Sequence, residues 1–390
     1  MHLKNPVSRR TFMEGMAAAL GTLGIPSSEA LARQQPSAQT GDVQTLDYDS
    51  MAKLASNENP YGPSQAVLKA MQDAAKYAHR YGYPDPGIVE AIAESHKVWP
   101  ENILLGAGST EILKVCDEVF LAQHKTLVGV DLTYESVYRF ATNSKADAIK
   151  VPLLEDYRTD IPGIIRAVKT NYRDVGLVYI CNPNNPTGRI VPKQEIRRLI
   201  DNVPEDVPVL IDEAYCHYVD HSDYEEAMHY VRDERNVIVT RTFSKLAGLA
   251  GMRLGYAVAR KEWIEKMAPF ASGNYTTGGV NVLVKYAAVA ALKEMGNSTQ
   301  VRRRTTDLRK KTVSELTAYG YDVMPSDANY FMVDIGEDVD LVSFDFQKHG
   351  VLVGRKFPPY DTWLRISIGT EDEMRRFVAA FKAIMPPIKR

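Results

Sequence analysis

The 390-residue sequence has only three cysteines and a formal net charge of −2. The cysteines Cys116, Cys181 and Cys216 are widely spaced and lie in apolar surroundings, which favours buried thiols over a disulfide framework or a metal site. The near-neutral charge gives no electrostatic reason to expect binding to nucleic acid or to an anionic membrane. A hydrophobic content of 45% is that of an ordinary globular protein, long enough here for two or more domains.

The N-terminal apolar stretch, residues 16–25, is too short to span a bilayer comfortably as a permanent helix. It follows a basic start that contains Arg9 and Arg10, and it precedes a small-residue cleavage site, an arrangement typical of a secretory signal. The paired arginines resemble the twin-arginine type, which a receptor reads. We therefore expect residues 1–32 to be an export signal and 33–47 a flexible lead-in, with the mature protein in the periplasm; a cytoplasmic location is the alternative.

From Leu54 onward, short apolar runs alternate with amphipathic stretches of helical length. The seven runs predicted as strands are 102–106, 126–130, 148–153, 176–181, 208–212, 236–240 and 255–259. Helical stretches between them include 109–119, 191–202 and 224–232. Such alternation indicates a mainly parallel sheet covered by helices on both faces. We predict an α/β fold, with a large domain over residues 86–281 built on a seven-stranded, mainly parallel sheet.

The C-terminal part, residues 282–390, has a different pattern. Its predicted elements are two long helices, two shorter strands and a last helix, at 282–295, 299–318, 330–335, 363–369 and 371–384. This order predicts a smaller α+β domain. The segment 48–85 is expected to pack with it.

Four polar motifs directly follow predicted strands. They are GAGSTE (106–111), NPNNPTG (182–188), DEAY (212–215) and TFSKLAGLAGMRLGY (242–256). Parallel strands end at one edge of a sheet, and ligands bind there. The first motif opens a helix with glycines and hydroxyls, which suits a phosphate at a helix N-terminus. Taken alone, each motif is also compatible with an ordinary helix cap or turn.

Four charged residues lie in or beside apolar segments of the sequence. Lys245, in a glycine-rich apolar setting, can have a lowered pKa and act as an amine nucleophile, and Arg253 can meet a bound dianion. Asp212 ends a buried strand and Arg365 lies inside an apolar one, so each needs a partner of opposite charge. A turn contact for Lys245, a helix cap for Asp212 and an internal salt bridge for Arg365 are the structural alternatives.

In this order, the motifs resemble the fold-type I pyridoxal-phosphate enzymes of aminotransferase class I/II, and most closely the histidinol-phosphate aminotransferase-like branch. NENPYGPS (57–64), YPDP (83–86) and LRISIGT (364–370) share the resemblance, which runs from about Leu54 to near the end. It implies pyridoxal 5′-phosphate as cofactor, held by Lys245 as a Schiff base. It also implies ping-pong transfer of an amino group between an amino acid, or a related amine, and a 2-oxo acid.

The resemblance assigns the other cofactor contacts. Asp212 matches the partner of the pyridine nitrogen, and Asn185 and Tyr215 match the pair on the ring hydroxyl oxygen. Tyr134 matches the aromatic residue that stacks on the ring. The residues that match the phosphate site are Gly108, Ser109, Thr110, Thr242, Ser244 and Arg253.

The resemblance also implies substrate contacts and a partner. Arg365 matches the residue that binds the α-carboxylate, and Asn59 and Arg355 are further candidates for substrate binding. Tyr83 matches a tyrosine that reaches the cofactor phosphate of the other subunit, which implies a homodimer with shared active sites. Tyr81 lies close enough in the sequence to leave that assignment open.

Other functions are compatible with the same motifs. The same scaffold hosts decarboxylases and amino-acid oxidases or hydroxylases, and it hosts transcription regulators, although no helix-turn-helix of adequate length is present. Thr110 and the stretch 271–279 depart from the usual pattern of the histidinol-phosphate branch. Export would also separate the enzyme from a cytoplasmic biosynthetic intermediate. We therefore expect a substrate other than histidinol phosphate, with the donor and acceptor left open.

Overall fold

The computed structural model describes residues 48–121, 125–272, 279–295 and 299–388. The predicted export signal, the lead-in and residues 273–278 lie outside the described residues. Ser50–Arg390 forms one compact unit. Within the described ranges, no helix is long and apolar enough to cross a membrane, and no cluster of histidine, cysteine and acidic residues could hold a metal ion.

The large sheet has seven strands, as predicted, in the order β2-β8-β7-β6-β5-β3-β4. The strands are β2 Ile103–Gly106, β3 Thr126–Val130, β4 Asp147–Val151, β5 Val175–Cys181, β6 Val209–Asp212, β7 Val237–Thr242 and β8 Gly255–Val258. β8 runs antiparallel to both of its neighbours, and the other strands are parallel to one another. The α/β prediction is confirmed.

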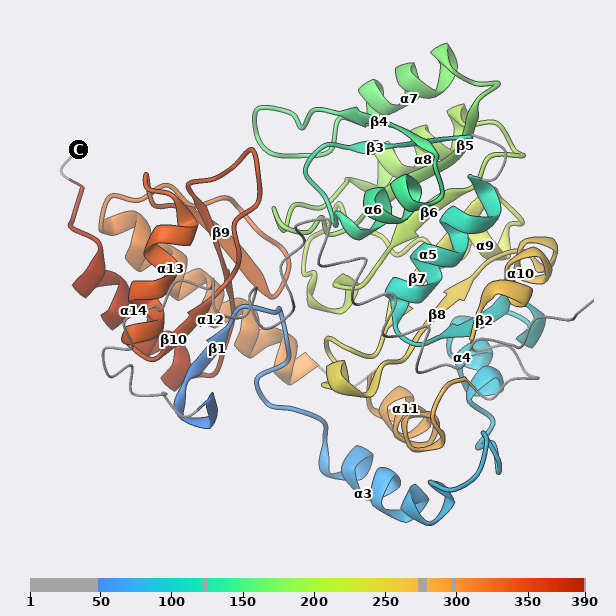
Figure 1. Ribbon diagram of the computed structural model, residues 1–390, viewed down its shortest axis with the longest axis horizontal. Helices are drawn as coiled ribbons and strands as arrows, with labels where there is room; N and C mark the ends of the chain where they lie inside the picture. Colours follow the sequence, from blue (N-terminus) through green and yellow to red (C-terminus); the bar gives the residue numbers. More distant parts are fainter. Residues whose placement is uncertain (1–47, 122–124, 273–278, 296–298, 389–390) are drawn as a thin grey trace, which may run out of the picture. The chain divides into compact units, whose positions relative to one another are not determined.

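Helices cover both faces of this sheet (Figure 1). One apolar core contains side chains of α5 Ser109–Phe120, α6 Ser136–Asn143 and α10 Lys261–Met267. The core on the opposite face contains side chains of α4 Ile88–His96, α7 Ile161–Thr170, α8 Lys193–Asn202, α9 Met228–Arg232 and α11 Val282–Met295. The strands between the two cores are continuously apolar because both of their faces are buried.

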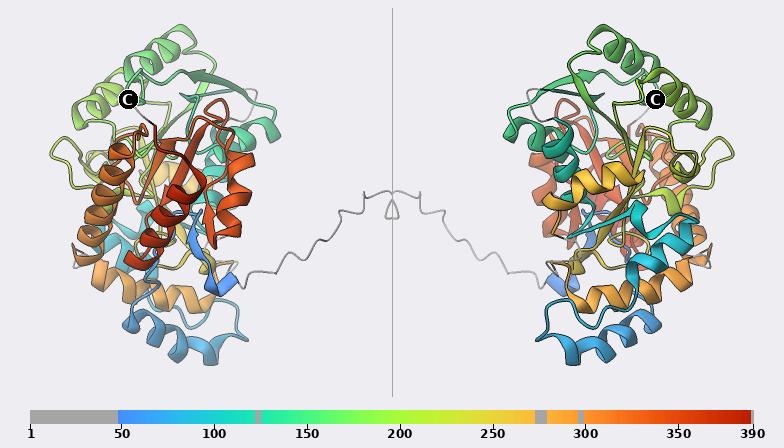
Figure 2. Two further views of the ribbon diagram at one scale, coloured as in Figure 1. Left: turned by 90° about the vertical axis from the view of Figure 1, so that its left-hand side faces the viewer. Right: turned by 90° about the vertical axis from the view of Figure 1, so that its right-hand side faces the viewer.

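Helix α11 was expected to belong to the C-terminal part, but it packs against the large sheet. Its buried side chains, among them Val284, Ala287 and Ala291, pack into the core of the large sheet. Helix α3 Gln65–Ala74 lies alongside α11, as Figures 1 and 2 show in blue and orange. An apolar helix with small residues allows this close approach. The domain boundaries drawn from the sequence remain predictions.

Two small sheets form around the C-terminal part. β1 Ala52–Leu54 pairs in parallel with β10 Val351–Val353, and β9 Tyr330–Asp334 pairs antiparallel with β11 Trp363–Ser367. Their helices are α12 Thr299–Ala318, α13 Val339–Lys348 and α14 Glu371–Ile384. Aromatic side chains fill their shared core, including Phe331, Phe346, Phe377 and Phe381. β1 therefore attaches the N-terminal segment to the C-terminal part.

Short 3₁₀ turns complete the described elements. They are Tyr48–Ser50, Ala75–Tyr77, Pro100–Asn102, Cys216–Tyr218, Ala250–Met252 and Ala268–Phe270. Because β2, β5, β6 and β7 are parallel, the four polar motifs that follow them meet at one edge of the large sheet. The antiparallel β8 begins at the same edge and brings Arg253 there.

Candidate active site

Side chains from these strand ends line one cleft at the carboxyl edge of the large sheet. The cleft has a volume of about 220 Å³. Ten of the residues predicted from the sequence line it: Ser109, Thr110, Tyr134, Asn185, Asp212, Tyr215, Thr242, Ser244, Lys245 and Arg253. The structure therefore brings together residues that lie more than a hundred positions apart in the chain.

Glycines bring a guanidinium group against the start of α5. Gly108 has a φ of 88°, and a Cβ atom there would overlap the guanidinium of Arg253. A Cβ atom on Gly255 would overlap the backbone of Ser109. The N-cap residue of α5, Gly108, has no side chain to cap the first turn, so N–H groups there are available to an anion. This end of the cleft is suited to a phosphate group.

Hydroxyl groups extend the same anion site. The Thr242 hydroxyl donates to Ser244 Oγ at 2.9 Å, and Arg253 Nη1 donates to Ser244 Oγ at 3.3 Å. The Thr110 and Tyr134 hydroxyl oxygens lie 3.3 Å apart. Arg253 has no ion pair with any acidic residue in the described part of the chain. Its charge is therefore available to a bound dianion.

Asp212 is a buried carboxylate at the end of β6. Its oxygens accept hydrogen bonds from the Tyr179 hydroxyl and from the Ala214 backbone N–H, each at 3.1 Å. Burial raises the pKa of Asp212 to about 6, although the two hydrogen bonds and Lys245 oppose the rise. Asp212 takes part in no ion pair among the described residues. A cationic ring nitrogen would supply the partner that a buried carboxylate needs.

Tyr215 and Asn185 form the other side of the cleft. The Tyr215 hydroxyl oxygen accepts hydrogen bonds from Asn57 Nδ2 at 3.1 Å and from Asn185 Nδ2 at 3.4 Å. Because the oxygen already accepts two bonds, its own proton is free to be donated to a ligand. Burial raises the pKa of Tyr215 well above its usual value, so the hydroxyl keeps that proton.

Lys245 lies between these groups. Its Nζ donates to the backbone oxygen of Ser56 at 3.0 Å and lies 5.5 Å from the centre of the Tyr215 ring. Burial lowers the pKa of Lys245 to about 8, and the positive charges of Arg365 and Arg253 contribute. An appreciable fraction of the amine is therefore neutral, and nucleophilic, near pH 7 to 8.

Arg365 reaches the cleft region from β11. Its Nη1 donates to Asn185 Oδ1 and its Nη2 to the Ala55 backbone oxygen, each at 2.7 Å. The side chain is buried between the rings of Tyr330 and Phe357, and its Nε has no hydrogen-bond partner. No carboxylate of the described residues pairs with it. A buried cation in this state is costly until an anion binds beside it.

The comparisons with known proteins agree with this geometry. The profile of the aminotransferase class I and II family matches residues 49–381. The chain belongs to this family. It is 38% identical over 351 residues to a histidinol-phosphate aminotransferase from Moorella thermoacetica, with 87% of each chain covered. It is 36% identical over 345 residues to histidinol-phosphate aminotransferase 1 from Dechloromonas aromatica, with 86% of this chain and 90% of the relative covered.

A solved structure shows the same fold with the cofactor bound. The histidinol-phosphate aminotransferase from Sinorhizobium meliloti, in complex with pyridoxal-5′-phosphate, aligns with a TM-score of 0.76 and 26% identity, covering 86% of this chain and 90% of that one. The chain is thus a pyridoxal phosphate-dependent transaminase of fold type I. These relatives favour transamination over the decarboxylase and oxidase alternatives.

The residues of the cleft fit pyridoxal phosphate. Gly108 and Gly255 leave space where Cβ atoms would collide with the anion-binding groups. Asp212 is a buried carboxylate with no cationic partner among the described residues, as a protonated pyridine nitrogen requires. Tyr215 has a proton to donate, and Lys245 an amine of lowered pKa. Each end of the cofactor therefore has a matching group in the cleft.

Two predicted substrate contacts are engaged elsewhere. The Asn59 side chain donates to the Leu246 backbone oxygen at 2.8 Å, so it holds the backbone beside Lys245. Arg355 forms an ion pair with Glu135 at 3.0 Å and stacks on Phe357, 4.2 Å from the ring centre. Neither lines the cleft, and their roles toward a substrate remain predictions.

Tyr83 lies away from the cofactor cleft of its own chain. It is 74% exposed, and Tyr81 is 92% exposed. Both line a separate cleft of about 600 Å³, together with residues such as Ile264 and Val280. A contact of either tyrosine with a cofactor phosphate would therefore have to involve a second copy of the chain.

Several cleft residues were not predicted as site residues. Ser56 and Glu58 line the cleft. Asn57 donates a hydrogen bond to the Tyr215 hydroxyl oxygen, and Tyr179 donates one to Asp212 Oδ2. Cys181 is buried, as expected, and also lines the cleft. Tyr179 could have been found from the period of a strand, because it lies two residues before Cys181 and faces the same side of the sheet. Asn57 and Glu58 lie in the motif NENPYGPS, but the motif alone does not show that they reach the cleft, which depends on long-range packing.

Proposed function

We propose that the enzyme acts on α-amino acids and 2-oxo acids, with the cofactor aldehyde held by Lys245 and the substrate carboxylate bound by Arg365. The observation that carries this proposal is the set of charged side chains without ionic partners around one cleft, two of which, Arg365 and Asp212, are buried. Arg365, Arg253 and Asp212 each have only neutral hydrogen-bond partners among the described residues. Their charges match a carboxylate, a phosphate and a ring cation, respectively.

When bound, pyridoxal phosphate supplies an aldehyde that takes up the amino group and a ring that accepts electrons as the Cα proton leaves. With the cofactor bound, Lys245 Nζ would take the proton from the substrate Cα as general base and hold it for return as general acid. Arg365 orients the carboxylate so that the Cα–H bond is presented to Lys245. Asp212 supplies negative charge at the ring nitrogen, and Tyr215 donates to the ring oxygen.

Replacement of the lysine tests the assignment. Lys245→Ala should lower turnover by more than about 10³-fold, because the nucleophile and the proton carrier are both lost. The visible absorbance of the bound cofactor should change as well, and borohydride should no longer fix the cofactor to the chain. Lys266→Ala, at an exposed position of α10, is the control. Unchanged turnover and borohydride labelling in Lys245→Ala would contradict the assignment.

A panel of donors and acceptors identifies the substrate. The purified chain should transfer an amino group from one or more α-amino acids only when a 2-oxo acid is present. Histidinol phosphate belongs in the panel, because the relatives carry that name while Thr110 and 271–279 depart from the usual pattern. Turnover that needs no acceptor, with release of CO₂ or uptake of oxygen, would contradict transamination.

We also propose a homodimer in which Tyr83 of one subunit contacts the cofactor phosphate of the other. The exposure of Tyr83 and its separation from the cleft of its own chain support this arrangement. Tyr83→Phe should weaken cofactor binding several-fold, whereas Tyr81→Phe should not. Sedimentation should show a dimer; a monomer that retains full activity would contradict the proposal.

Export remains a proposal as well. Its support is the sequence of residues 1–32, with the twin arginines at 9 and 10. Cell fractionation should find the mature chain in the periplasm, and replacement of both arginines by lysine should abolish that export. An unprocessed chain found only in the cytoplasm would contradict it.

A further inference from the structure

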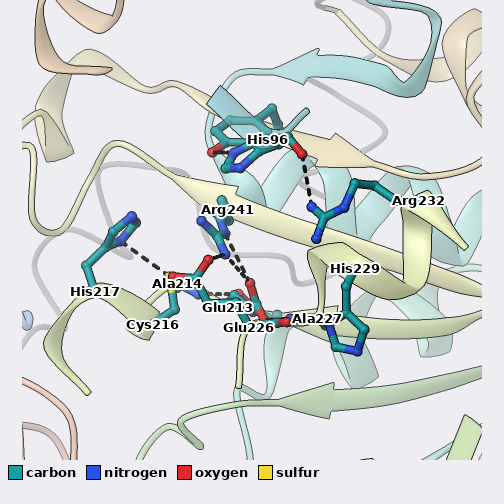
Figure 3. Close-up of polar contacts among 12 residues, drawn as sticks. His96, Glu213, Ala214, Cys216, His217, Glu226, Ala227, His229, Arg232 and Arg241 are labelled. Atoms are coloured by element: carbon teal, nitrogen blue, oxygen red, sulfur yellow. Dashed lines mark hydrogen bonds and ion pairs between the residues drawn. The ribbon is translucent and has the colours of Figure 1, made fainter. Parts of the chain in front are cut away.

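A cluster of three charged residues, Glu213, Glu226 and Arg241, lies at the carboxyl ends of β6 and β7 (Figure 3). It is on the face of the sheet opposite to the cofactor cleft. Asp212 pairs in register with Thr240, and the Glu213 backbone N–H donates to the Thr240 oxygen at 2.9 Å. Side chains alternate between the faces of a strand. Asp212 and Thr242 therefore face the cofactor cleft, while their chain neighbours Glu213 and Arg241 face the opposite side.

The charges of this cluster are fully paired. Arg241 donates to Glu213 Oε2 from Nε at 3.0 Å and from Nη2 at 2.6 Å, and Nη2 also lies 2.8 Å from Glu226 Oε2. Glu213 Oε1 accepts from the Ala227 backbone N–H at 2.6 Å. The side chains of Arg241 and Glu213 are 4% and 0% exposed. A pair so completely removed from water holds its geometry firmly, because either charge alone would be costly.

Two histidines border this cluster, and the positive charges of Arg232 and Arg302 also act on them. His96 bonds the Tyr256 hydroxyl at 2.8 Å, and His217 approaches Cys216 Sγ at 3.4 Å. Burial, and then Arg241, lower the pKa of His96 to about 3 and that of His217 to about 4, so both imidazoles are neutral at physiological pH. Among the described residues, Arg241 forms ion pairs only with Glu213 and with the half-exposed Glu226.

We propose that Glu213 and Arg241 are positioning residues for the cofactor. Their pairing fixes the ends of β6 and β7, and thereby sets Asp212 against the ring and Thr242 against the phosphate. The inference rests on the proposed function, which assigns those two contacts. A shift of about 1 Å in either strand end would separate the two halves of the cofactor site, and misplacements of this size can cost on the order of 10²-fold in rate.

The test uses Glu213→Gln, which keeps the shape of the side chain and removes its charge. The dissociation constant of pyridoxal phosphate, measured by fluorescence titration of the apoprotein, should rise at least tenfold. The bound cofactor's visible spectrum should shift, and kcat should fall more than KM rises. Arg241→Lys, which keeps the charge but loses the forked contact, should give an intermediate result.

Two controls separate positioning from loss of stability. Ile164→Ala opens a cavity in the same core but in α7, far along the chain from both strand ends. Compared at an equal loss of Tm, it should change the dissociation constant less than twofold. Asp201→Asn breaks an exposed ion pair with Arg235, in which the nitrogen and oxygen atoms lie 2.6 Å apart. Arg235 precedes the start of β7, at the end of the strand remote from the cleft. This substitution should change neither stability nor cofactor binding measurably.

The outcomes are distinguishable. If Glu213→Gln behaves like Ile164→Ala at matched Tm, the pair is only structural and the inference is wrong. If Glu213→Gln does not fold, Arg241→Lys and Glu226→Gln decide, and wild-type cofactor affinity in both overturns the inference. If Asp212→Asn and Lys245→Ala themselves leave the cofactor spectrum unchanged, the proposed function fails instead.

Discussion

The two faces of β6 and β7 carry the same kinds of side chain in opposite states. On the cleft side, Asp212 at the end of β6 and Arg253 in the turn before β8 are charged groups with only neutral partners in the described structure. On the opposite face, Glu213 and Arg241 neutralise each other at 2.6 Å. Sequence neighbours thus differ completely in what they require. Burial without an ionic partner marks a group that awaits a ligand, and burial with one marks a group that holds the fold.

This difference assigns opposite consequences to adjacent residues. Removal of a charge on the cleft face takes away an interaction made with the cofactor. It does not lower the stability of the apoprotein, because the removed charge has no ionic partner there. Removal of a charge on the opposite face leaves the partner unpaired in the protein itself. Mutations one position apart should therefore separate into losses of activity and losses of stability.

Among changes that test the comparison of the two faces, Asp212→Asn should have the largest effect. The amide keeps the hydrogen bond to Tyr179 in shape but cannot hold a proton on the ring nitrogen, so kcat should fall by roughly 10²- to 10³-fold. The Tm of the apoprotein should stay equal or rise, because a buried carboxylate without an ionic partner is removed. Steady-state kinetics and thermal unfolding of the apoprotein provide the measurement. A large loss of apoprotein stability would break the comparison between the two faces.

Arg365→Gln should come next. Loss of the guanidinium removes a charge-assisted contact worth about 1.5–3 kcal/mol, which lowers kcat/KM for amino acids by about 10- to 100-fold. The loss should appear mainly as a higher KM. Arg355→Gln is the matched control, since it breaks a half-exposed pair with Glu135 of the kind that contributes about 0–1 kcal/mol. Equal effects of the two variants would show that Arg355 also binds the substrate.

Much of the fold could be predicted from the sequence. Both faces of the large sheet are covered, so its strands are uninterrupted apolar runs, and all seven were found. The helix Glu371–Ile384 has the predicted bounds, which its capping box at Thr370 explains. β1 and β10 were not found. Each has three residues and is stabilised by a partner about 300 positions away, so no local pattern identifies it.

The site was predictable where a strand end carries a motif. Asp212, Asn185 and Lys245 each follow a strand, and strand order alone brings them to one edge. Asn57 and Ser56 were not identified, because they reach the cleft through the packing of a distant segment. The sequence singled out Asp212 but not the pairing of Glu213 with Arg241, which depends on the register of β6 on β7.

Asp117, in α5, is a buried carboxyl group that differs from both Asp212, which faces the cleft, and Glu213, which is paired with Arg241. Neither of the Asp117 oxygens has a hydrogen-bond partner among the described residues, and Asp117 lies in neither the cleft nor the charged cluster. Burial raises its pKa to about 8, so the folded chain keeps it protonated while the unfolded chain ionises near pH 4. The folded state then binds the extra proton between these values, and stability falls as the pH rises from about 4 to 8.

Relative to the wild type, Asp117→Asn should therefore gain about 5 kcal/mol of stability between pH 4 and pH 8, because about four pKa units separate the folded and unfolded carboxyl groups. Denaturant unfolding of both proteins across this range measures the difference. Turnover at saturating cofactor should change less than twofold, since the group touches neither cofactor nor substrate. A variant with the pH profile of the wild type would show that Asp117 has a partner after all. In that case it would belong with Glu213 among the paired charges that hold the fold.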